Sequence, residues 1–262
     1  ADTISAAAGT IIFGDDVAAN INFSADGILQ VAGDLDGNVD NKSGTSNRGT
    51  VNLTGTGAVT GALGATKSLK LVTAGATGYS TTFDGAINAT TVAIGGGSAS
   101  FAEGITGNVT VNGGSFTLAA GKNISGYIDA LAGGSSMTFS GSSTIGGLVG
   151  STTAFDLITA GAANSTVTFS SAVKAGTIEV ASGTVAFSDN ATGDINFTDD
   201  GVVQLAAGKT ITGYVDNKTG ADGAGTLTFA GASTVTKAIG VTNALKLITA
   251  AQGGAATVFG ES

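Results

Sequence analysis

The stretch KTITGYVDNKTG at residues 209–220 decides the fold, because close relatives of it stand at two earlier places in the chain. These are KNISGYIDALAG at residues 122–133 and GDLDGNVDNKSG at residues 33–44. The flanking segments recur in the same order, so that GTIIF at residue 9 returns as GSASF at residue 97 and GTVAF at residue 183. These spacings of 88 and 86 residues divide the chain into three long repeats, approximately 1–88, 89–174 and 175–262. Repetition on this scale is typical of stacked architectures, and we expect one continuous unit over residues 1–262.

Short strands are the dominant local signal inside each repeat. Large apolar residues alternate with small or polar ones, as in Val185 and Phe187 or Ile195 and Phe197, which is the pattern of a strand with one buried face. Gly, Asn, Asp and Ser, which favour turns, separate these segments. Proline, which removes a backbone donor from a sheet, is absent. The pattern predicts an all-β protein, a right-handed parallel β-solenoid.

The number of rungs in each repeat stays open at this point. About nine strand candidates per repeat fit three triangular rungs of about 29 residues, and four rungs of about 22 residues fit as well, both within the range of solenoid repeats. In either arrangement we expect the equivalent residues Phe13, Phe101 and Phe187 to point into the core.

Composition limits the classes of partner. Hydrophobic residues make up 42% of the chain, enough for a core, whereas only 11% of residues are charged. The net charge of -9 and the scattered lysines argue against binding to nucleic acid or to an anionic membrane surface. Membrane insertion of this segment is not expected, since no apolar run reaches the length that spans a bilayer.

One longer segment carries a family resemblance. The sequence NINFSADGILQVAGDLDGNVDNKSG, continuing to residue 75, resembles the passenger region of rickettsial autotransporter surface proteins, the outer membrane protein B and surface cell antigen group. The same order of phrases recurs at residues 107–161 and 193–250. The resemblance implies an exported β-helical stalk at the bacterial cell surface, with a structural or adhesive role toward a host or neighbouring cell. It also implies that a signal peptide and a translocator barrel belong to other parts of a longer protein.

The residue types present favour a protein that is not an enzyme. Histidine and cysteine are absent, which removes the usual general base, thiolate nucleophile and zinc ligands. The acidic pairs Asp15–Asp16 and Asp199–Asp200 are best interpreted as turn caps. A weak calcium site at these pairs is the alternative, and no other cofactor is expected. The second hypothesis for the whole chain is an enzyme or binding module that acts on carbohydrate from the same scaffold.

Three further aspartates recur with the repeat. Asp40, Asp129 and Asp216 each follow Val or Ile in the repeated phrase, and we interpret them as turn caps rather than as ligands. The preceding aromatic residue is Tyr127 or Tyr214 in two copies but Asn38 in the first, so a shared binding site is not indicated.

Two kinds of polar residue recur along the strands. The lysines form no run and are expected on a solvated face. Ten asparagines head Asn-x-Ser/Thr triplets, which are glycosylation acceptors in secreted proteins, but strand alternation also produces this spacing.

The two ends of the segment predict a self-association surface. ADTISAAAGT at residue 1 matches AGTIEVASGT at residue 175, and the last strand, ATVFGES, stops close to where another repeat would begin. An uncapped solenoid end exposes unpaired strand edges. We therefore expect head-to-tail stacking of chains into a filament, with a segment of a longer array as the alternative. The residues expected at this contact are Thr3, Ile4, Ser5 and Ala6 on one edge and Ala256, Thr257, Val258 and Phe259 on the other.

Overall fold

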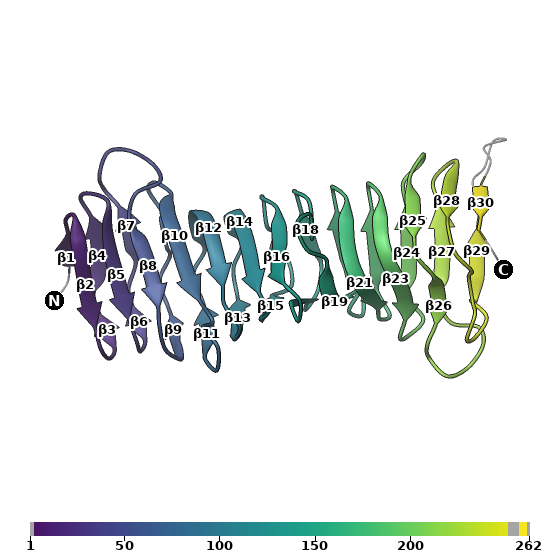
Figure 1. Ribbon diagram of the computed structural model, residues 1–262, viewed down its shortest axis with the longest axis horizontal. Coiled ribbons are helices and arrows are strands. Elements are labelled where there is room, and N and C mark those ends of the chain that lie inside the picture. The colour runs from purple at the N-terminus through teal and green to yellow at the C-terminus, as the bar shows by residue number, and fades with distance from the viewer. Residues whose placement is uncertain (1–2, 251–256, 261–262) are drawn as a thin grey trace. The chain divides into compact units, whose positions relative to one another are not determined.

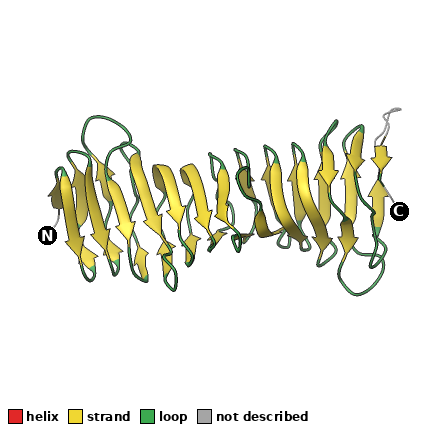
Figure 2. Cartoon of the chain, viewed as in Figure 1, coloured by secondary structure: helices red, strands yellow, loops and turns green. Residues whose placement is uncertain are grey.

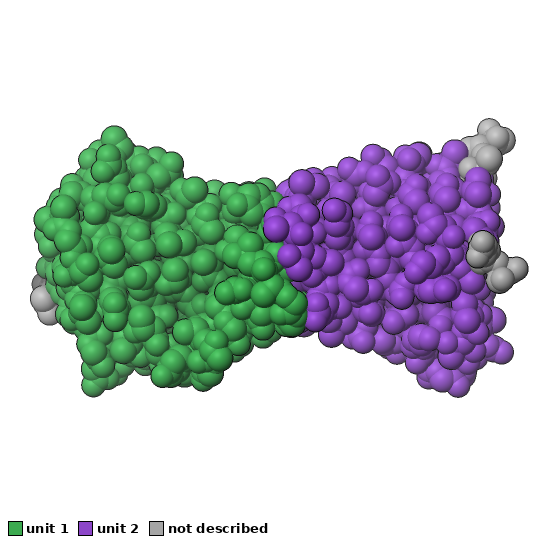
Figure 3. Space-filling model, in the orientation of Figure 1, with its two compact units in different colours: residues 1–135 green, residues 136–262 purple. Residues whose placement is uncertain are grey.

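The computed structural model describes residues 3–250 and 257–260 as two compact units, Ala1–Ser135 (unit 1) and Ser136–Ser262 (unit 2; Figure 3). Throughout the described residues, every regular element is a β-strand, and the paired strands run parallel (Figure 2). The described part of the chain accordingly holds no helix that is long and apolar enough to cross a membrane.

Unit 1 is built from three parallel sheets, as Figure 1 shows by the stacking of β1 to β16. The first sheet comprises β1 (Thr3–Ala6), β4 (Asn20–Phe23) and β7 (Val39–Asn41). The second comprises, in spatial order, β2 (Gly9–Phe13), β5 (Gly27–Val31), β8 (Thr50–Leu53), β10 (Leu69–Ala74), β12 (Ile87–Ile94), β14 (Ile105–Asn112) and β16 (Ile128–Ala132). The third comprises β3 (Val17–Ala18), β6 (Leu35–Asp36), β9 (Gly57–Val59), β11 (Ser80–Phe83), β13 (Ser98–Phe101) and β15 (Ser115–Leu118).

Unit 2 is built from two runs of paired parallel strands. One run of paired strands comprises β18 (Ser143–Ile145), β20 (Thr166–Phe169), β22 (Thr184–Phe187), β24 (Val202–Leu205), β27 (Thr226–Phe229) and β29 (Leu247–Thr249). The other comprises β17 (Ser136–Phe139), β19 (Phe155–Ala160), β21 (Val173–Val180), β23 (Ala191–Phe197), β25 (Thr210–Thr212), β28 (Ser233–Val235) and β30 (Thr257–Phe259), with β26 (Val215–Asn217) also paired to β23.

The register of these pairs confirms the β-solenoid and decides the number of rungs. Ile4 pairs with Ile21 in the next rung, and Val39 in turn bridges Leu63. Four rungs lead from Ile4 to Ile87 in unit 1 and from Val149 to Val235 in unit 2. The alternative with four shorter rungs per repeat is therefore right, and the one with three longer, triangular rungs is wrong. The predicted division into three long repeats and one continuous solenoid stays a prediction.

The core of each unit consists of inward-facing residues stacked from rung to rung. Phe83 and Phe101 stack with their ring centroids 5.0 Å apart, and Phe169 and Phe187 stack at 5.6 Å. Phe101 and Phe187 are buried as predicted. Phe13 is only half-buried, because its strand β2 is paired on one side alone, with β5.

Polar side chains at the corners link one rung to the next. Asn20 accepts a hydrogen bond from the backbone N–H of Asn38 (2.9 Å), and the side chain of Asn38 accepts one from the N–H of Ala62 (2.8 Å). Asp194 accepts the N–H of Tyr214 in the same way (3.0 Å). Side chains that favour turns thus satisfy backbone donors of the following rung.

Candidate recognition site: two clamped loops

Two loops project from the solenoid, one in each unit, and they occupy equivalent places in the repeat. Loop 1, residues 42–49, joins β7 to β8, and loop 2, residues 218–225, joins β26 to β27 (Figure 1). Each loop follows the phrase Val-Asp-Asn, and the two have the same length. Short surface loops whose ends lie close together often carry binding residues, so the two loops are candidate recognition sites.

A buried asparagine holds the base of each loop. Asn41 has no exposed surface, and its amide donates to the carbonyl groups of Thr45 (2.8 Å) and Ser68 (2.9 Å). Its side-chain oxygen accepts hydrogen bonds from the N–H and the hydroxyl group of Ser43. All hydrogen-bonding groups of the side chain are thereby occupied. Asn41 heads an Asn-x-Ser triplet, and its burial leaves the side chain inaccessible for glycosylation.

Asn217 repeats this arrangement in unit 2. Its amide donates to the carbonyl groups of Ala221 (2.8 Å) and Ala244 (2.9 Å), and its oxygen accepts from the N–H (3.0 Å) and the hydroxyl group (2.7 Å) of Thr219. The match extends to burial, since Asn217 also has no exposed surface.

The preceding aspartate ties the loop to the next rung. Asp40 accepts the N–H of Thr66 (2.9 Å) and forms an ion pair with Lys42 (2.6 Å). Burial raises the pKa of this carboxyl group, but hydrogen bonds from Lys42 and Thr66 outweigh burial and lower the pKa to about 2. Asp40 therefore acts as the turn cap expected from the sequence.

Asp216 makes the corresponding contacts with Thr242 (2.9 Å) and Lys218 (2.6 Å). Burial again raises its pKa, and the bonds from Lys218 and Thr242 again lower it to about 2. Asp216 is thus the turn cap of its own repeat, and Asp129 is also buried in the middle repeat.

The glycine that ends each loop packs against a phenylalanine ring and donates a hydrogen bond to an aspartate. Gly49 has a φ of +83°, and a Cβ atom there would lie 2.4 Å from the ring of Phe23. Its N–H donates to Asp26 (3.2 Å), whose carboxylate also pairs with Lys70 (3.2 Å). The bond from Gly49 is the largest cause, ahead of Lys70, of the lowered pKa of Asp26.

Gly225 ends loop 2 in the same manner. Its φ is +82°, a Cβ atom would lie 2.4 Å from the ring of Phe197, and its N–H donates to Asp200 (3.2 Å). Asp200 also forms an ion pair with Lys246, and the hydrogen bond from Lys246 is the main reason that its pKa is lowered. Lys70 and Lys246 lie exposed to solvent, as expected of the lysines, and in addition they form the ion pairs that support the loops.

The acidic pairs singled out as a weak calcium alternative serve as acceptors for backbone groups. Asp15 accepts the N–H of Asp16 (3.0 Å), and Asp199 accepts the N–H of Asp200 (2.7 Å). Asp16 accepts the N–H of Asp34 in the next rung (2.8 Å). Among the described residues no cluster brings together three or more acidic side chains that could hold a metal ion. The calcium hypothesis stays a prediction.

The middle repeat lacks the loop. Asp129 is followed by Ala130, which is fully buried where the other copies have asparagine, and β16 continues to Ala132. The stretch of chain from Asp129 to Met137 is shorter than the stretch from Asp40 to the equivalent Val51. Buried asparagine and projecting loop are thus present together or absent together.

The tips of the two loops differ although their bases match. Loop 1 carries Thr45-Ser46-Asn47-Arg48 where loop 2 carries Ala221-Asp222-Gly223-Ala224. The oxygen of Asn47 accepts hydrogen bonds from the hydroxyl groups of Ser68 (2.7 Å) and Thr90 (2.8 Å). Asp222 instead accepts the N–H of Ala244 (2.7 Å). One tip is therefore cationic and the other acidic on the same support.

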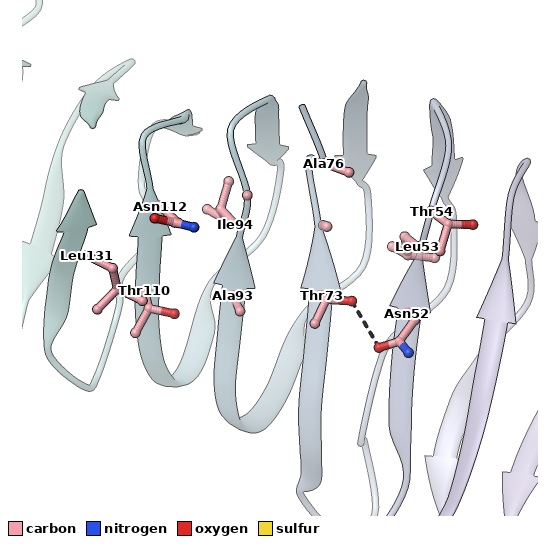
Figure 4. A pocket seen from close by; sticks show the side chains of 12 residues that line it. Asn52, Leu53, Thr54, Thr73, Ala76, Ala93, Ile94, Thr110, Asn112 and Leu131 are labelled. Atoms are coloured by element: carbon pink, nitrogen blue, oxygen red, sulfur yellow. Dashed lines mark hydrogen bonds between the residues drawn. The ribbon is translucent and has the colours of Figure 1, made fainter. Parts of the chain in front are cut away.

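A shallow groove lies on the outer face of unit 1, with a volume of about 550 Å³ (Figure 4). It crosses β8 to β16 and is lined by apolar residues together with threonine and asparagine, and a hydrogen bond joins two of the lining residues, Thr73 and Asn52 (3.0 Å). None of its lining residues is acidic or basic.

The chain is similar to a rickettsial outer membrane protein. The two chains are 33% identical over 221 residues, and the protein concerned is outer membrane protein A of Rickettsia rickettsii. The match covers 84% of this chain and 8% of the relative, so the chain spans about 8% of the length of the curated protein it matches. No protein family profile matches the chain, and no solved structure matches it.

Proposed function

We propose that the chain is a structural segment of a bacterial cell-surface protein whose solenoid presents recognition loops to a host or neighbouring cell, without catalysis. The similarity to an outer membrane protein supports the surface location. The narrower membership expected from the sequence, in the outer membrane protein B and surface cell antigen group of autotransporter passengers, belongs to this proposal. The parallel solenoid supplies a rigid support, and loops on rigid supports are where binding residues concentrate.

The matched bases of loops 1 and 2 carry the proposal. Asparagine, aspartate, lysine and glycine make the same contacts under both tips. Tip residues can therefore change while these base contacts stay the same. The tips themselves add only the hydrogen bonds accepted by Asn47 in loop 1 and by Asp222 in loop 2. This is the arrangement that a binding surface needs when its specificity lies in a few exposed residues.

The test exchanges the tips. In one variant residues 45–48 receive Ala-Asp-Gly-Ala, and in the other residues 221–224 receive Thr-Ser-Asn-Arg. Beads coated with each chain are applied to epithelial cells and to bacterial cells. We expect altered adhesion with a change of no more than about 2 to 4 °C in the midpoint of thermal unfolding, because each exchange removes only the exposed hydrogen bonds of Asn47 or of Asp222. Adhesion that is the same for the wild type, both exchanges and a chain with both tips replaced by glycine would refute the recognition role.

Head-to-tail self-association is the second candidate. In β30, Val258 and Phe259 are 53% and 46% exposed, and β30 is paired only with β28 among the described strands. At the other edge, Thr3, Ile4, Ser5 and Ala6 pair, among the described strands, only with β4. Ala256, also expected at this contact, lies outside the described residues. Such edges accept a further strand, either from another copy or from more of the same chain.

Replacement of Val258 and Phe259 by lysine tests this candidate. If copies associate through this edge, the double variant sediments as a smaller species than the wild type at the same concentration and keeps its β-sheet circular dichroism. A wild type that sediments as a monomer at high concentration would exclude the candidate and would leave the recognition role untouched.

A further inference from the structure

We infer that a cleft beside the base of loop 2 binds a single uncharged sugar unit. The cleft has a volume of about 250 Å³ and is lined by Asp194, Asn196, Tyr214, Asp216, Lys218, Val241 and Thr242. It lies wholly within unit 2. Pockets for drug-sized ligands run from roughly 300 to 1,000 Å³, so this cleft suits one small polar group of a larger molecule.

Part of the lining holds the base of loop 2 and is unavailable to a ligand. Asp216 accepts hydrogen bonds from the N–H groups of Thr242 and Asn217, from the hydroxyl group of Thr242 and from Lys218. These four bonds use the capacity of its two oxygens. Asp216 is therefore a wall of the cleft rather than a ligand-binding group.

The remaining lining offers both donors and acceptors. Asp194 spends one oxygen on the N–H of Tyr214 (3.0 Å) and keeps the other. Asn196 follows Asp194 by two residues in β23 and projects from the same face of the strand. Its side chain makes no hydrogen bond within the described residues. Lys218 donates to Asp216 and Thr242, which leaves one of its three N–H groups.

The apolar part of the cleft, formed by Tyr214 and Val241, is also exposed to solvent. Tyr214 is 41% exposed and Val241 is 63% exposed. The ammonium group of Lys237, which is not part of the lining, lies over the Tyr214 ring, 4.6 Å from its centre. Tyrosine presents an apolar ring and a polar hydroxyl group together.

These groups select the chemistry of the ligand. A metal ion is disfavoured because the one available carboxylate, that of Asp194, shares the cleft with Lys218. An anion is disfavoured by the same carboxylate. A sugar ring fits both the polar and the apolar part of the lining, because its hydroxyl groups donate and accept hydrogen bonds and its C–H face packs on an aromatic ring. For a ligand of about a dozen heavy atoms, the expected dissociation constant is in the low millimolar range.

Two equivalent places in unit 1 supply the controls. The first repeat has Asn38 where unit 2 has Tyr214, and Gly61 where it has Lys237. Tyr214→Asn therefore introduces a residue that the same turn accepts elsewhere. The second repeat has Tyr127, which is 39% exposed and whose N–H is accepted by Asn108 (3.2 Å), as that of Tyr214 is by Asp194.

The experiment follows backbone amide chemical shifts of the full chain during titration with methyl α-mannoside, methyl β-galactoside and N-acetylglucosamine. We expect one of these probes to move the signals of Asp194, Asn196 and Val241. Tyr214→Asn should weaken that binding by at least about tenfold, the loss of roughly one good aromatic contact, whereas Tyr127→Asn should leave it unchanged. Absence of any shift at about ten times the expected dissociation constant, equal loss in both variants, or the same shifts with sodium sulfate would overturn the inference.

This cleft is independent of the tips of the loops. Adhesion that survives both tip exchanges but is lost in Tyr214→Asn would reject the proposed loop recognition and retain the sugar site. The opposite result would retain the loops, and the titration alone would then accept or reject the cleft.

Discussion

Loop 1 and loop 2 have the same base and different tips, and the difference shows which residues hold the structure. Under each loop stand a buried asparagine, an ion-paired aspartate and a terminal glycine packed on phenylalanine. Above them, Arg48 in one loop is replaced by Ala224 in the other, and Ser46 by Asp222. Residues that make the same base contacts in both loops should therefore be sensitive to substitution in both units. Residues that differ, apart from Asn47 and Asp222 with their hydrogen bonds, should be tolerant.

The largest expected effect comes from the glycine that ends each loop. Gly49→Ala and Gly225→Ala place a methyl group 2.4 Å from a buried phenylalanine ring at a φ above +80°. Strain of the backbone and crowding of the core together should lower the free energy of unfolding by roughly 3 kcal/mol. Urea unfolding followed by tyrosine fluorescence and by amide signals of the affected unit measures this change.

The matched controls are the first glycines of the same loops. Gly44 and Gly220 have φ values of +86° and +89°, but a Cβ atom there meets nothing within 4 Å. Alanine at these positions should lower the free energy of unfolding by only about 1 kcal/mol. Equal losses at both ends of a loop would show that the contact with phenylalanine is unimportant.

Asn217 and its counterpart Asn41 occur in the two repeats that carry a loop and are absent from the repeat that lacks it. Asn217→Ala removes four hydrogen bonds from a fully buried site. It leaves the carbonyl groups of Ala221 and Ala244 without this partner, so the free energy of unfolding should fall by about 2 to 3 kcal/mol. Asn41→Ala should have an equal effect, because its contacts are the same.

The reverse exchange sharpens the comparison. Ala130→Asn puts an amide into the fully buried position of the loopless repeat, where no loop offers partners. It should destabilise by a similar amount, since a buried polar group without hydrogen bonds is unfavourable. If Ala130→Asn were neutral in hydrogen-exchange measurements of unit 1, asparagine would not be the residue that distinguishes the repeats.

Acid should weaken both loop bases. The pKa of Asp40 and of Asp216 is about 2 in the folded chain, below the ordinary value of 3.8. The folded state therefore favours the ionised form, and the associated stability is complete above about pH 4 and is lost as the pH falls toward 2. Each residue should contribute about 2 kcal/mol. Urea midpoints measured between about pH 5 and pH 2 should decline less steeply in Asp216→Asn than in the wild type, and identical slopes would contradict this assignment.

The sequence predicted the solenoid and the capping role of Asp40 and Asp216, because alternation and turn residues are local signals. It did not predict the partners of Lys70 and Lys246, which lie 44 and 46 residues from Asp26 and Asp200. Those partners meet only because the lengths of successive rungs add up to these separations, and rung length is not visible before the strands are paired. For the same reason the sequence groups Asp200 with its neighbour Asp199, although Asp200 is the counterpart of Asp26 and binds the glycine of loop 2.

The smallest expected effect concerns two equivalent serines that differ only in their partners. Ser143 in β18 and Ser233 in β28 are 4% and 5% exposed. Ser233 donates a hydrogen bond to the carbonyl group of Ala206 (3.2 Å), whereas the hydroxyl oxygen of Ser143 is buried without a partner among the described residues. Removing a buried hydroxyl group that makes no bond relieves its desolvation, and removing one that makes a bond does not. Ser143→Ala should therefore raise the free energy of unfolding by up to about 1 kcal/mol, and Ser233→Ala should lower it by about 1 kcal/mol. Paired urea titrations of the two variants decide the matter by the sign of the difference, and a loss of stability in Ser143→Ala would mean that its hydroxyl group has a partner in solution.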